Sequence, residues 1–330
     1  METSVLPSLS AGVEPRRSER GSFASLLLVL EVGLCIGATG GAAYLITQSH
    51  TALSTDYLSR TPFSSWVIPG LLLALCIALP AGVVAFGAAT RRTYAHVGHP
   101  LLGLTLMGWI VVQVAVLGPI SLLQPAMFAW GLAMLLLGLP NYRQWHTGWG
   151  ATAAERAGVM AGDSLIVRPH FVATRAITID APTEAVWPWI IQMGYGRAGW
   201  YSYDLLDNRG RRSTQGIEAR WQQLRIGDRV RMSARADDHT AFRVRALVPY
   251  QLLVWAKPDA TWSWRLEAAG SGTTRLVTRV RARYEGAAAL LGAPLMEIGD
   301  YPMMRRCLLG IKTGAERPSS GAMSDPGGSR

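Results

Sequence analysis

The stretch Phe171-Val-Ala-Thr-Arg-Ala-Ile-Thr-Ile179 is followed directly by Asp180-Ala-Pro-Thr-Glu-Ala-Val-Trp-Pro-Trp189. The first part is rich in β-branched residues and predicts a strand. The second part has Asp180 near a helix start, a proline in the first turn and Glu184 near the positive end of the helix dipole. Apolar residues then recur with helical spacing, so we expect a strand that leads into an amphipathic helix kinked at Pro188.

The next stretch, Gly194-Tyr-Gly-Arg-Ala-Gly-Trp200, contains the letters G-x-G-x-x-G of a dinucleotide-binding loop. Such a loop follows a strand and opens a helix, whose N-terminus faces the pyrophosphate. Here the glycines follow a predicted helix instead. We therefore expect them to end that helix and reverse the chain, before a short helix over Ser202 to Gly210.

Apolar residues and arginines alternate with period two from Asp228 onward, which predicts an antiparallel sheet with one covered face. The predicted strands are 230–234, 242–246, 262–266 and 276–284, and Val277 is the exception to the alternation. The other face carries Arg229, Arg231, Arg235, Arg243, Arg245, Arg275, Arg279, Arg281 and Arg283. We expect a solvated arginine face, with contact to an anionic membrane leaflet as the alternative. No nucleic-acid reading motif accompanies the charge, so we expect no nucleic-acid partner.

A helix is predicted to close the sheet. Asp300 stands at its expected cap and Pro302 in its first turn. Its apolar stripe consists of Met304, Cys307, Leu308 and Ile311. Residues 315–330 are rich in Ser, Pro and Gly and predict a disordered tail.

The N-terminal half is far more apolar. The segments 24–46 and 66–89 are each long enough to cross a bilayer as a helix, and 101–139 reads as a hairpin of two further spans. Glu31 and Gln113 fall within these spans, and an acid inside a membrane is a functional candidate by default. We expect Glu31 to reach the lipid headgroups, and His96 and His99 to be interfacial rather than metal ligands.

Charge sets the expected orientation. Residues 1–150 hold seven basic and five acidic residues, whereas residues 151–330 hold 25 and 17. Arginines near the ends of the spans place both termini in the cytoplasm by the positive-inside rule. The expected organisation is a cytoplasmic tail (1–22), four transmembrane helices (23–140), a juxtamembrane linker (141–170), a folded domain (171–314) and the tail (315–330). We expect a multi-pass protein of a bacterial-type inner or plasma membrane.

Several short stretches of the sequence resemble motifs of a bacterial branch of the START-like (SRPBCC) superfamily. They are Gly150-Ala-Thr, Gly162-Asp163, 173–182, Val186-Trp-Pro-Trp189, 192–204 and Leu308-Leu-Gly-Ile-Lys312. The superfamily includes polyketide cyclases/dehydrases, plant allergen-type lipid carriers and START lipid-transfer domains. The resemblance covers about residues 147–316 and implies an α+β helix-grip fold, in which a curved antiparallel sheet wraps a long C-terminal helix. Here an all-α bundle of four transmembrane helices precedes it.

The same resemblance implies an apolar pocket between sheet and helix. The lining residues expected from it are Trp187, Trp200, Tyr201, Tyr203, Trp255, Trp262, Trp264, Tyr284, Met304 and Leu308. An aromatic stripe is as often plain core as ligand site, so the two interpretations stay open for each single residue. No zinc, haem or P-loop motif occurs, and we expect neither metal nor cofactor.

Three functions fit these observations. The favoured one is a membrane-anchored carrier or sensor that binds a hydrophobic small molecule or lipid. The second is a cyclase/dehydrase-type enzyme using Asp204, Asp207 or Tyr203 as weak catalytic candidates. The third is a ligand-free regulatory scaffold, whose protein partner the sequence does not identify. We expect binding rather than catalysis.

Overall fold

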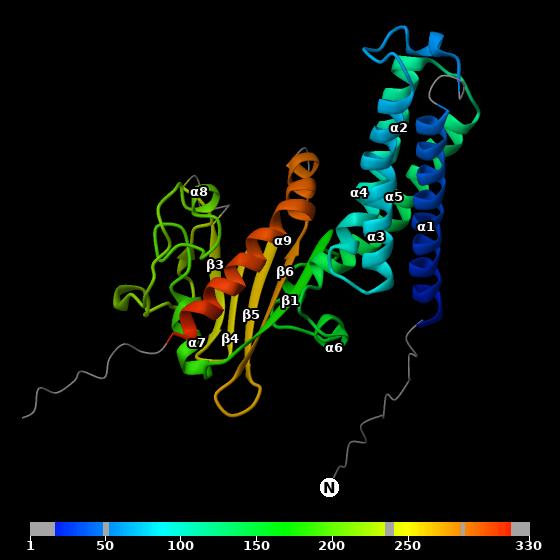
Figure 1. Ribbon diagram of the computed structural model, residues 1–330. Helices are drawn as coiled ribbons and strands as arrows, with labels where there is room; N and C mark the ends of the chain where they lie inside the picture. Colours follow the sequence, from blue (N-terminus) through cyan, green and yellow to red (C-terminus); the bar gives the residue numbers. More distant parts are fainter. Residues whose placement is uncertain (1–16, 49–52, 235–240, 285–287, 318–330) are drawn as a thin grey trace, which may run out of the picture. The chain divides into compact units, whose positions relative to one another are not determined.

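The computed structural model describes residues 17–48, 53–234, 241–284 and 288–317. The chain divides into two compact units, Met1–Arg143 and Gln144–Arg330 (Figure 1). Arg235 and the predicted tail beyond residue 317 lie outside the described residues, as does most of the predicted N-terminal tail.

The first unit is helical. Its elements are α1 (Arg17–Thr47), a short 3-10 turn (Thr55–Leu58), α2 (Val67–Leu73), a π-helical turn (Ala74–Ala78), α3 (Leu79–Ala89), α4 (Ala95–Leu117) and α5 (Leu123–Thr147), which continues into the second unit. Within the described residues, four helices are long and apolar enough to cross a membrane: Ala24–Thr47, Val67–Ala89, Ala95–Leu117 and Leu123–Thr147. The predicted spans and the hairpin of 101–139 are thus present as helices, and α1 begins inside the predicted tail.

The span Val67–Ala89 carries a π-helical turn in its middle. Pro80 has no N–H with which to continue the α-helical ladder. The N–H of Leu79, just before it, bonds to the carbonyl of Ala74, five residues back, instead of four. The helix therefore continues through the proline with one extra residue in this turn.

Helices α4 and α5 approach closely where Gly103 faces Gly131. A Cβ added at Gly103 would lie 2.6 Å from the Gly131 carbonyl oxygen, and one at Gly131 would lie 2.8 Å from that of Gly103. Small residues at such crossings let two helix backbones touch inside a membrane, where packing replaces the hydrophobic effect.

The second unit contains a six-stranded antiparallel sheet in the order β1-β6-β5-β4-β3-β2. The strands are β1 (Phe171–Ile179), β2 (Arg229–Val230), β3 (Phe242–Val248), β4 (Leu252–Lys257), β5 (Ala260–Ala268) and β6 (Thr274–Ala282). The helices are α6 (Ala153–Ala157), α7 (Thr183–Ile191), α8 (Asp204–Asp207) and α9 (Ala288–Ala315). Short 3-10 turns lie at Asp163–Leu165 and Ala219–Trp221.

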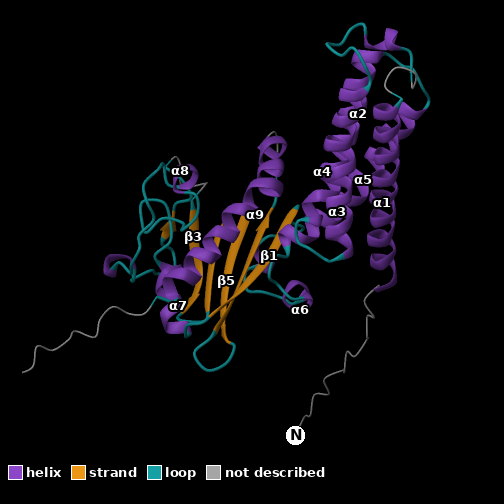
Figure 2. Cartoon of the chain, in the orientation of Figure 1, coloured by secondary structure: helices purple, strands orange, loops and turns teal. Residues whose placement is uncertain are grey.

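Helix α9 crosses one face of the sheet, which we call the inner face (Figure 2). Met304, Cys307, Leu308 and Ile311 of α9 are all buried in the same core cluster as the inner-face residues of the strands. The predicted stripe on the closing helix is therefore confirmed. A sheet gripping a C-terminal helix is consistent with the helix-grip fold that the resemblance implied.

The start predicted for this helix is wrong. It begins at Ala288 rather than at Asp300, so Pro302 lies inside it. The carboxylate of Asp300 does not cap a helix but binds the guanidinium of Arg175 on β1. An acid followed by a proline is typical of a helix start, but here Asp300 lies in the middle of α9, where its carboxylate forms a buried ion pair.

The glycine-rich loop behaves as predicted. It follows α7, and Gly194 and Gly199 pair in an antiparallel bridge with N–H to O distances of 3.0 and 3.2 Å. Gly199 has a φ of +85°, and a Cβ there would lie 2.4 Å from the Ser213 hydroxyl oxygen. The glycines therefore reverse the chain, and the strand-loop-helix geometry of a dinucleotide site is absent from this stretch.

The outer face of the sheet is covered at β1, β6 and β5, contrary to the expected solvated arginine face. Residues 148–166, which fall in the predicted linker, pack on it. Arg275 binds Glu155 and the Gly150 carbonyl, and Arg281 donates to the Ile166 carbonyl. Arg279 is only 4% exposed. These three arginines hold a protein segment and are not available to a membrane surface, whereas Arg245 on β3 is exposed.

Candidate functional site

The inner face of the sheet carries a cluster of four tryptophans, which we call the tryptophan cluster. Trp200 stacks on Trp262 at 5.5 Å between ring centroids, and Trp262 lies 5.0 Å from Trp264. Trp255 packs edge-on against Trp262 at 5.4 Å and against Trp264 at 5.9 Å. All four were predicted to line a pocket, and the structure brings them together.

Strand register places three of these rings. Trp255 on β4 is directly opposite Trp262 on β5, and Leu253 is opposite Trp264. Alternation along each strand then points all three side chains to the inner face. The fourth ring, Trp200, comes from the loop that Gly199 turns back over the sheet.

The cluster contains unpaired hydrogen-bond donors. The indole N–H of Trp262 donates to the Thr278 hydroxyl at 2.9 Å. The indole nitrogens of Trp200, Trp255 and Trp264 are buried and have no hydrogen-bond partner among the described residues. The three side chains are at most 4% exposed. Each of these donors costs about 1–3 kcal/mol while it is left unpaired, a cost that an apolar side chain at the same position would avoid.

The other predicted lining residues divide into two groups. Met304 and Leu308 are buried on α9, Tyr201 bonds to Gln192 at 2.7 Å, and Trp187 packs against Tyr250 at 6.2 Å. Tyr203 and Tyr284 are less buried, although Tyr284 still packs against the same core cluster. Tyr203 is 37% exposed with the Arg306 guanidinium 4.5 Å from its ring centroid. Tyr284 stacks on His170 at 5.9 Å.

The two candidate carboxylates differ in their surroundings. Asp204 accepts hydrogen bonds from the N–H and the hydroxyl of Ser213, at 3.1 and 2.6 Å, which gives it a structural role in the loop. Asp207 is 9% exposed, and neither oxygen makes a hydrogen bond of good geometry with a described residue. Burial, followed by the nearby Asp204 carboxylate, raises the pKa of Asp207 to about 6.

This raised pKa makes stability depend on pH at Asp207. The folded state holds the Asp207 proton more tightly than the unfolded chain, in which the pKa is about 3.9. The resulting stability is fully present below about pH 4 and is lost as the pH rises through about 6. We expect Asp207→Asn to match the wild type at pH 4 and to be roughly 1–2 kcal/mol more stable at pH 8, allowing for solvent screening.

Urea unfolding at both pH values checks this expectation. Asp259→Asn, at a surface acid paired with Lys257, is the matched control and should show a much smaller change. A gain for Asp207→Asn that is equal at pH 4 and pH 8 would contradict the assignment.

One polar group on the inner face, the guanidinium of Arg175, was not predicted from the sequence. Arg175 occupies an inward position of β1, between Ala173 and Ile177, and is 1% exposed. Its Nε donates to the His146 carbonyl at 2.8 Å and its Nη1 to Asp300 Oδ2 at 2.5 Å, while Nη2 is buried without a partner among the described residues. Burial raises the pKa of Asp300, and Arg175 opposes that rise. The signal was present, because Arg175 interrupts the apolar positions of its strand.

Arg175 lies in register with the tryptophan cluster. It is opposite Thr278 of β6, which is opposite Trp264 of β5. One row across the inner face therefore holds a guanidinium, a hydroxyl and an indole. Within the described ranges, no group of three His, Cys, Asp or Glu side chains is arranged to hold a metal ion.

No protein-family model and no curated protein matches this chain. Solved structures similar to part of it include a Polyketide_cyc-like protein from Corynebacterium glutamicum, at 14% identity, 43% of this chain, 88% of that chain and a TM-score of 0.28. A conserved protein of unknown function from Enterococcus faecalis has 10% identity over 47% and 79% of the two chains, with a TM-score of 0.30. The di-domain ARO/CYC protein BexL from the BE-7585A biosynthetic pathway has 18% identity over 59% and 60%, with a TM-score of 0.27. Polyketide cyclase-like proteins are thus among the structures similar to this chain, and its function has to be argued from its own residues.

Proposed function

We propose that the second unit binds a hydrophobic small molecule or lipid between α9 and the inner face of the sheet, and that the chain is a membrane-anchored carrier or sensor of that molecule. The observation that carries the proposal is the set of three buried indole N–H groups on Trp200, Trp255 and Trp264, none of which has a hydrogen-bond partner in the part of the chain that the structure describes. A ligand with acceptor oxygens would satisfy these donors while its apolar body packs on the rings. Aromatic walls with a few polar groups are typical of small-molecule sites.

Arg175 refines the expected ligand. Its Nη2, which has no hydrogen-bond partner among the described residues, adds a charged donor to the same face, in the row that includes Trp264. A molecule with a carbonyl or carboxylate at one end and a hydrocarbon or polycyclic body would match both groups. In this proposal four helices anchor the chain, and the arginines at their ends place both termini in the cytoplasm.

The test uses the full chain in nanodiscs. Native mass spectrometry and organic extraction should find an apolar molecule bound at one copy per chain. Trp264→Phe keeps an aromatic ring but removes one N–H, and we expect it to weaken binding of the extracted molecule by about five- to tenfold, the effect of one hydrogen bond. Trp189→Phe is the matched control, since Trp189 is also buried, at 6% exposed, but packs on Tyr201 outside the tryptophan cluster.

Two outcomes would overturn the proposal. Either no bound molecule is found and no lipid or polyketide raises the melting temperature, or Trp264→Phe and Trp189→Phe weaken binding equally. The first outcome would leave the ligand-free scaffold as the better interpretation.

A cyclase- or dehydrase-type reaction is the second candidate, and Asp207 favours it. A buried carboxyl with a pKa near 6 is suited to acid or base catalysis at neutral pH. Turnover of the extracted molecule by the wild type, and its loss in Asp207→Asn with binding unchanged, would move the assignment from carrier to enzyme.

A further inference from the structure

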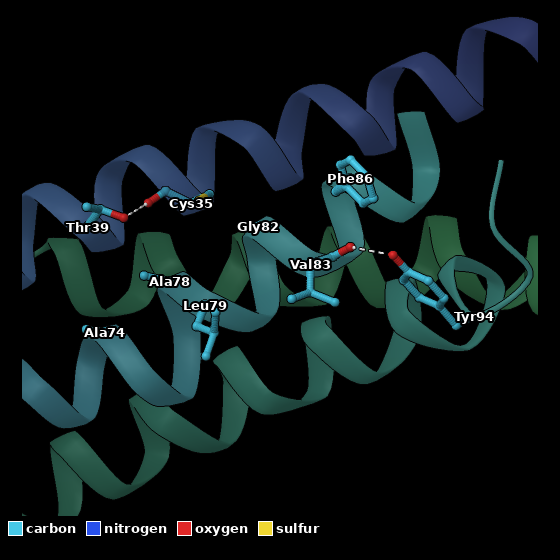
Figure 3. Close-up of a pocket in the computed structure, with 9 residues that line it drawn as sticks. All are labelled: Cys35, Thr39, Ala74, Ala78, Leu79, Gly82, Val83, Phe86 and Tyr94. Atoms are coloured by element: carbon cyan, nitrogen blue, oxygen red, sulfur yellow. Dashed lines mark hydrogen bonds between the residues drawn. The ribbon is translucent and has the colours of Figure 1, made fainter. Parts of the chain in front are cut away.

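The first unit has a groove of about 580 Å³ on its surface. It runs between α1, the π-helical turn and α3, and Tyr94 closes one end (Figure 3). The lining residues are Cys35, Thr39, Ala74, Ala78, Leu79, Gly82, Val83, Phe86 and Tyr94.

Small residues keep this groove open. Ala74 and Ala78 bound the π-helical turn, and Gly82 lies one turn later on α3. A Cβ at Gly82 would lie 3.3 Å from the Cys35 sulfur, so α1 and α3 approach closely at the floor of the groove. Leu79, Val83 and Phe86 are 48–62% exposed.

The groove presents hydrocarbon to its occupant. Its two hydroxyl groups are used internally, since Thr39 donates to the Cys35 carbonyl at 2.7 Å and Tyr94 to the Val83 carbonyl at 3.3 Å (Figure 3). From Ala74 to Phe86 the helix rises about 18 Å, which is close to one leaflet of a hydrocarbon core about 30 Å thick. An acyl chain of one leaflet matches this length.

Positive charge stands at the Tyr94 end. The turn between α3 and α4 carries Arg91 and Arg92, both exposed, and residues 90–100 include no Asp or Glu. The turn is held against α3, because the Arg92 N–H donates to the Gly87 carbonyl at 2.8 Å and the Tyr94 ring covers Gly87. Two arginines therefore follow directly on the apolar helix Val67–Ala89, two and three residues before Tyr94.

We propose that this groove is a binding site for one anionic phospholipid, with an acyl chain along Phe86, Val83 and Leu79 and the headgroup at Arg91 and Arg92. The site is independent of the ligand bound by the second unit. The charge at one end selects the headgroup, and the apolar length selects a chain from the leaflet on that side.

The experiment compares lipid retention by the full chain purified from nanodiscs of mixed phosphatidylglycerol and phosphatidylcholine, followed by native mass spectrometry after progressive delipidation. The wild type should retain one phosphatidylglycerol. Arg91→Gln with Arg92→Gln should reduce the preference for phosphatidylglycerol by about fivefold or more. The reason is that the attraction of one cation near a membrane surface for anionic lipid corresponds to about a fivefold change in affinity. Arg60→Gln, in the loop between the first two spans, is the matched control and should leave the preference unchanged.

A second pair of variants tests the groove itself. Val83→Trp fills it and should abolish retention of both lipids, whereas Leu104→Trp, at a residue that is 51% exposed on α4 and does not line the groove, should not. Circular dichroism and gel filtration confirm that each variant is folded. Equal retention by the two tryptophan variants, or an equal loss of preference with Arg60→Gln, would overturn the proposal.

Discussion

Replacing Arg279 with methionine should lower the free energy of unfolding of the second unit by about 3–5 kcal/mol, the usual cost of removing one member of a buried ion pair. Arg279 Nη1 donates to Asp163 at 2.6 Å and to the Gly158 carbonyl at 2.9 Å. Its Nε donates to the Thr174 hydroxyl at 2.8 Å, and its Nη2 to the Glu155 and Arg156 carbonyls at 2.7 and 3.1 Å. Methionine keeps the stem but leaves Asp163 and three carbonyls without this donor.

The effect separates a structural arginine from a solvated one. Arg245→Met, at an exposed position of β3, is the matched control and should change stability by less than about 0.5 kcal/mol. Urea unfolding followed by tryptophan fluorescence measures both variants, and limited proteolysis within 148–166 should accelerate only in Arg279→Met. Equal, small effects in the two variants would restore the interpretation of the whole arginine face as solvated.

The second large effect is expected in the helical unit, at Glu31. We expected this side chain to reach the headgroups, and the structure contradicts that. Glu31 is fully buried and its Oε1 binds Nδ1 of His99, which is itself 4% exposed. It stands in the interior stripe of α1 with Leu27, Leu34, Ala38 and Ala42. Glu31→Ala or His99→Ala should therefore destabilise the unit by about 3–5 kcal/mol, because the remaining partner stays buried without its counterpart.

Replacing both partners gives the sharper test. Glu31→Leu with His99→Leu should recover most of the stability lost in either single variant, since apolar residues of similar volume often substitute for a buried ion pair at little cost. Thermal aggregation of the full chain in detergent compares the variants, with Thr39→Ala, which removes only a hydroxyl bonded within α1, as the control. A single variant as stable as Thr39→Ala would show that Glu31 reaches solvent after all.

Much of the architecture was predictable from local patterns. The spans follow from apolar length, because an unbroken run of about 20 apolar residues has few alternatives to a helix in a bilayer. Strand β1 follows from its β-branched residues and strands β3, β5 and β6 from alternation. The reversal at Gly194 to Gly199 follows from the position of the glycines after a helix. For the site, the aromatic identity of Trp200, Trp255, Trp262 and Trp264 was visible, and their assembly into one cluster followed from the implied fold.

Other features had no local signal that could be interpreted correctly. Strand β4 was not predicted, because Val254 and Ala256 on its outer face are buried too, which removes the alternation. Val277, the exception in β6, packs with Met160 and Ala176 under the segment 148–166. Both irregularities have one cause: residues 148–166, which we predicted to be part of a linker, cover the outer face of the sheet.

The sequence by itself thus determined which segments are long and apolar enough to cross a membrane, which form most of the strands and which face of the sheet is apolar. Each of these depends on a period or a length that neighbouring residues set. Only the tertiary structure decided where the charges go. Arg279 meets Asp163 across 116 positions of chain, Arg175 meets Asp300 across 125, and Glu31 meets His99 across 68. Such pairs form because a buried charge requires a partner, and which partner is near depends on packing rather than on any local pattern.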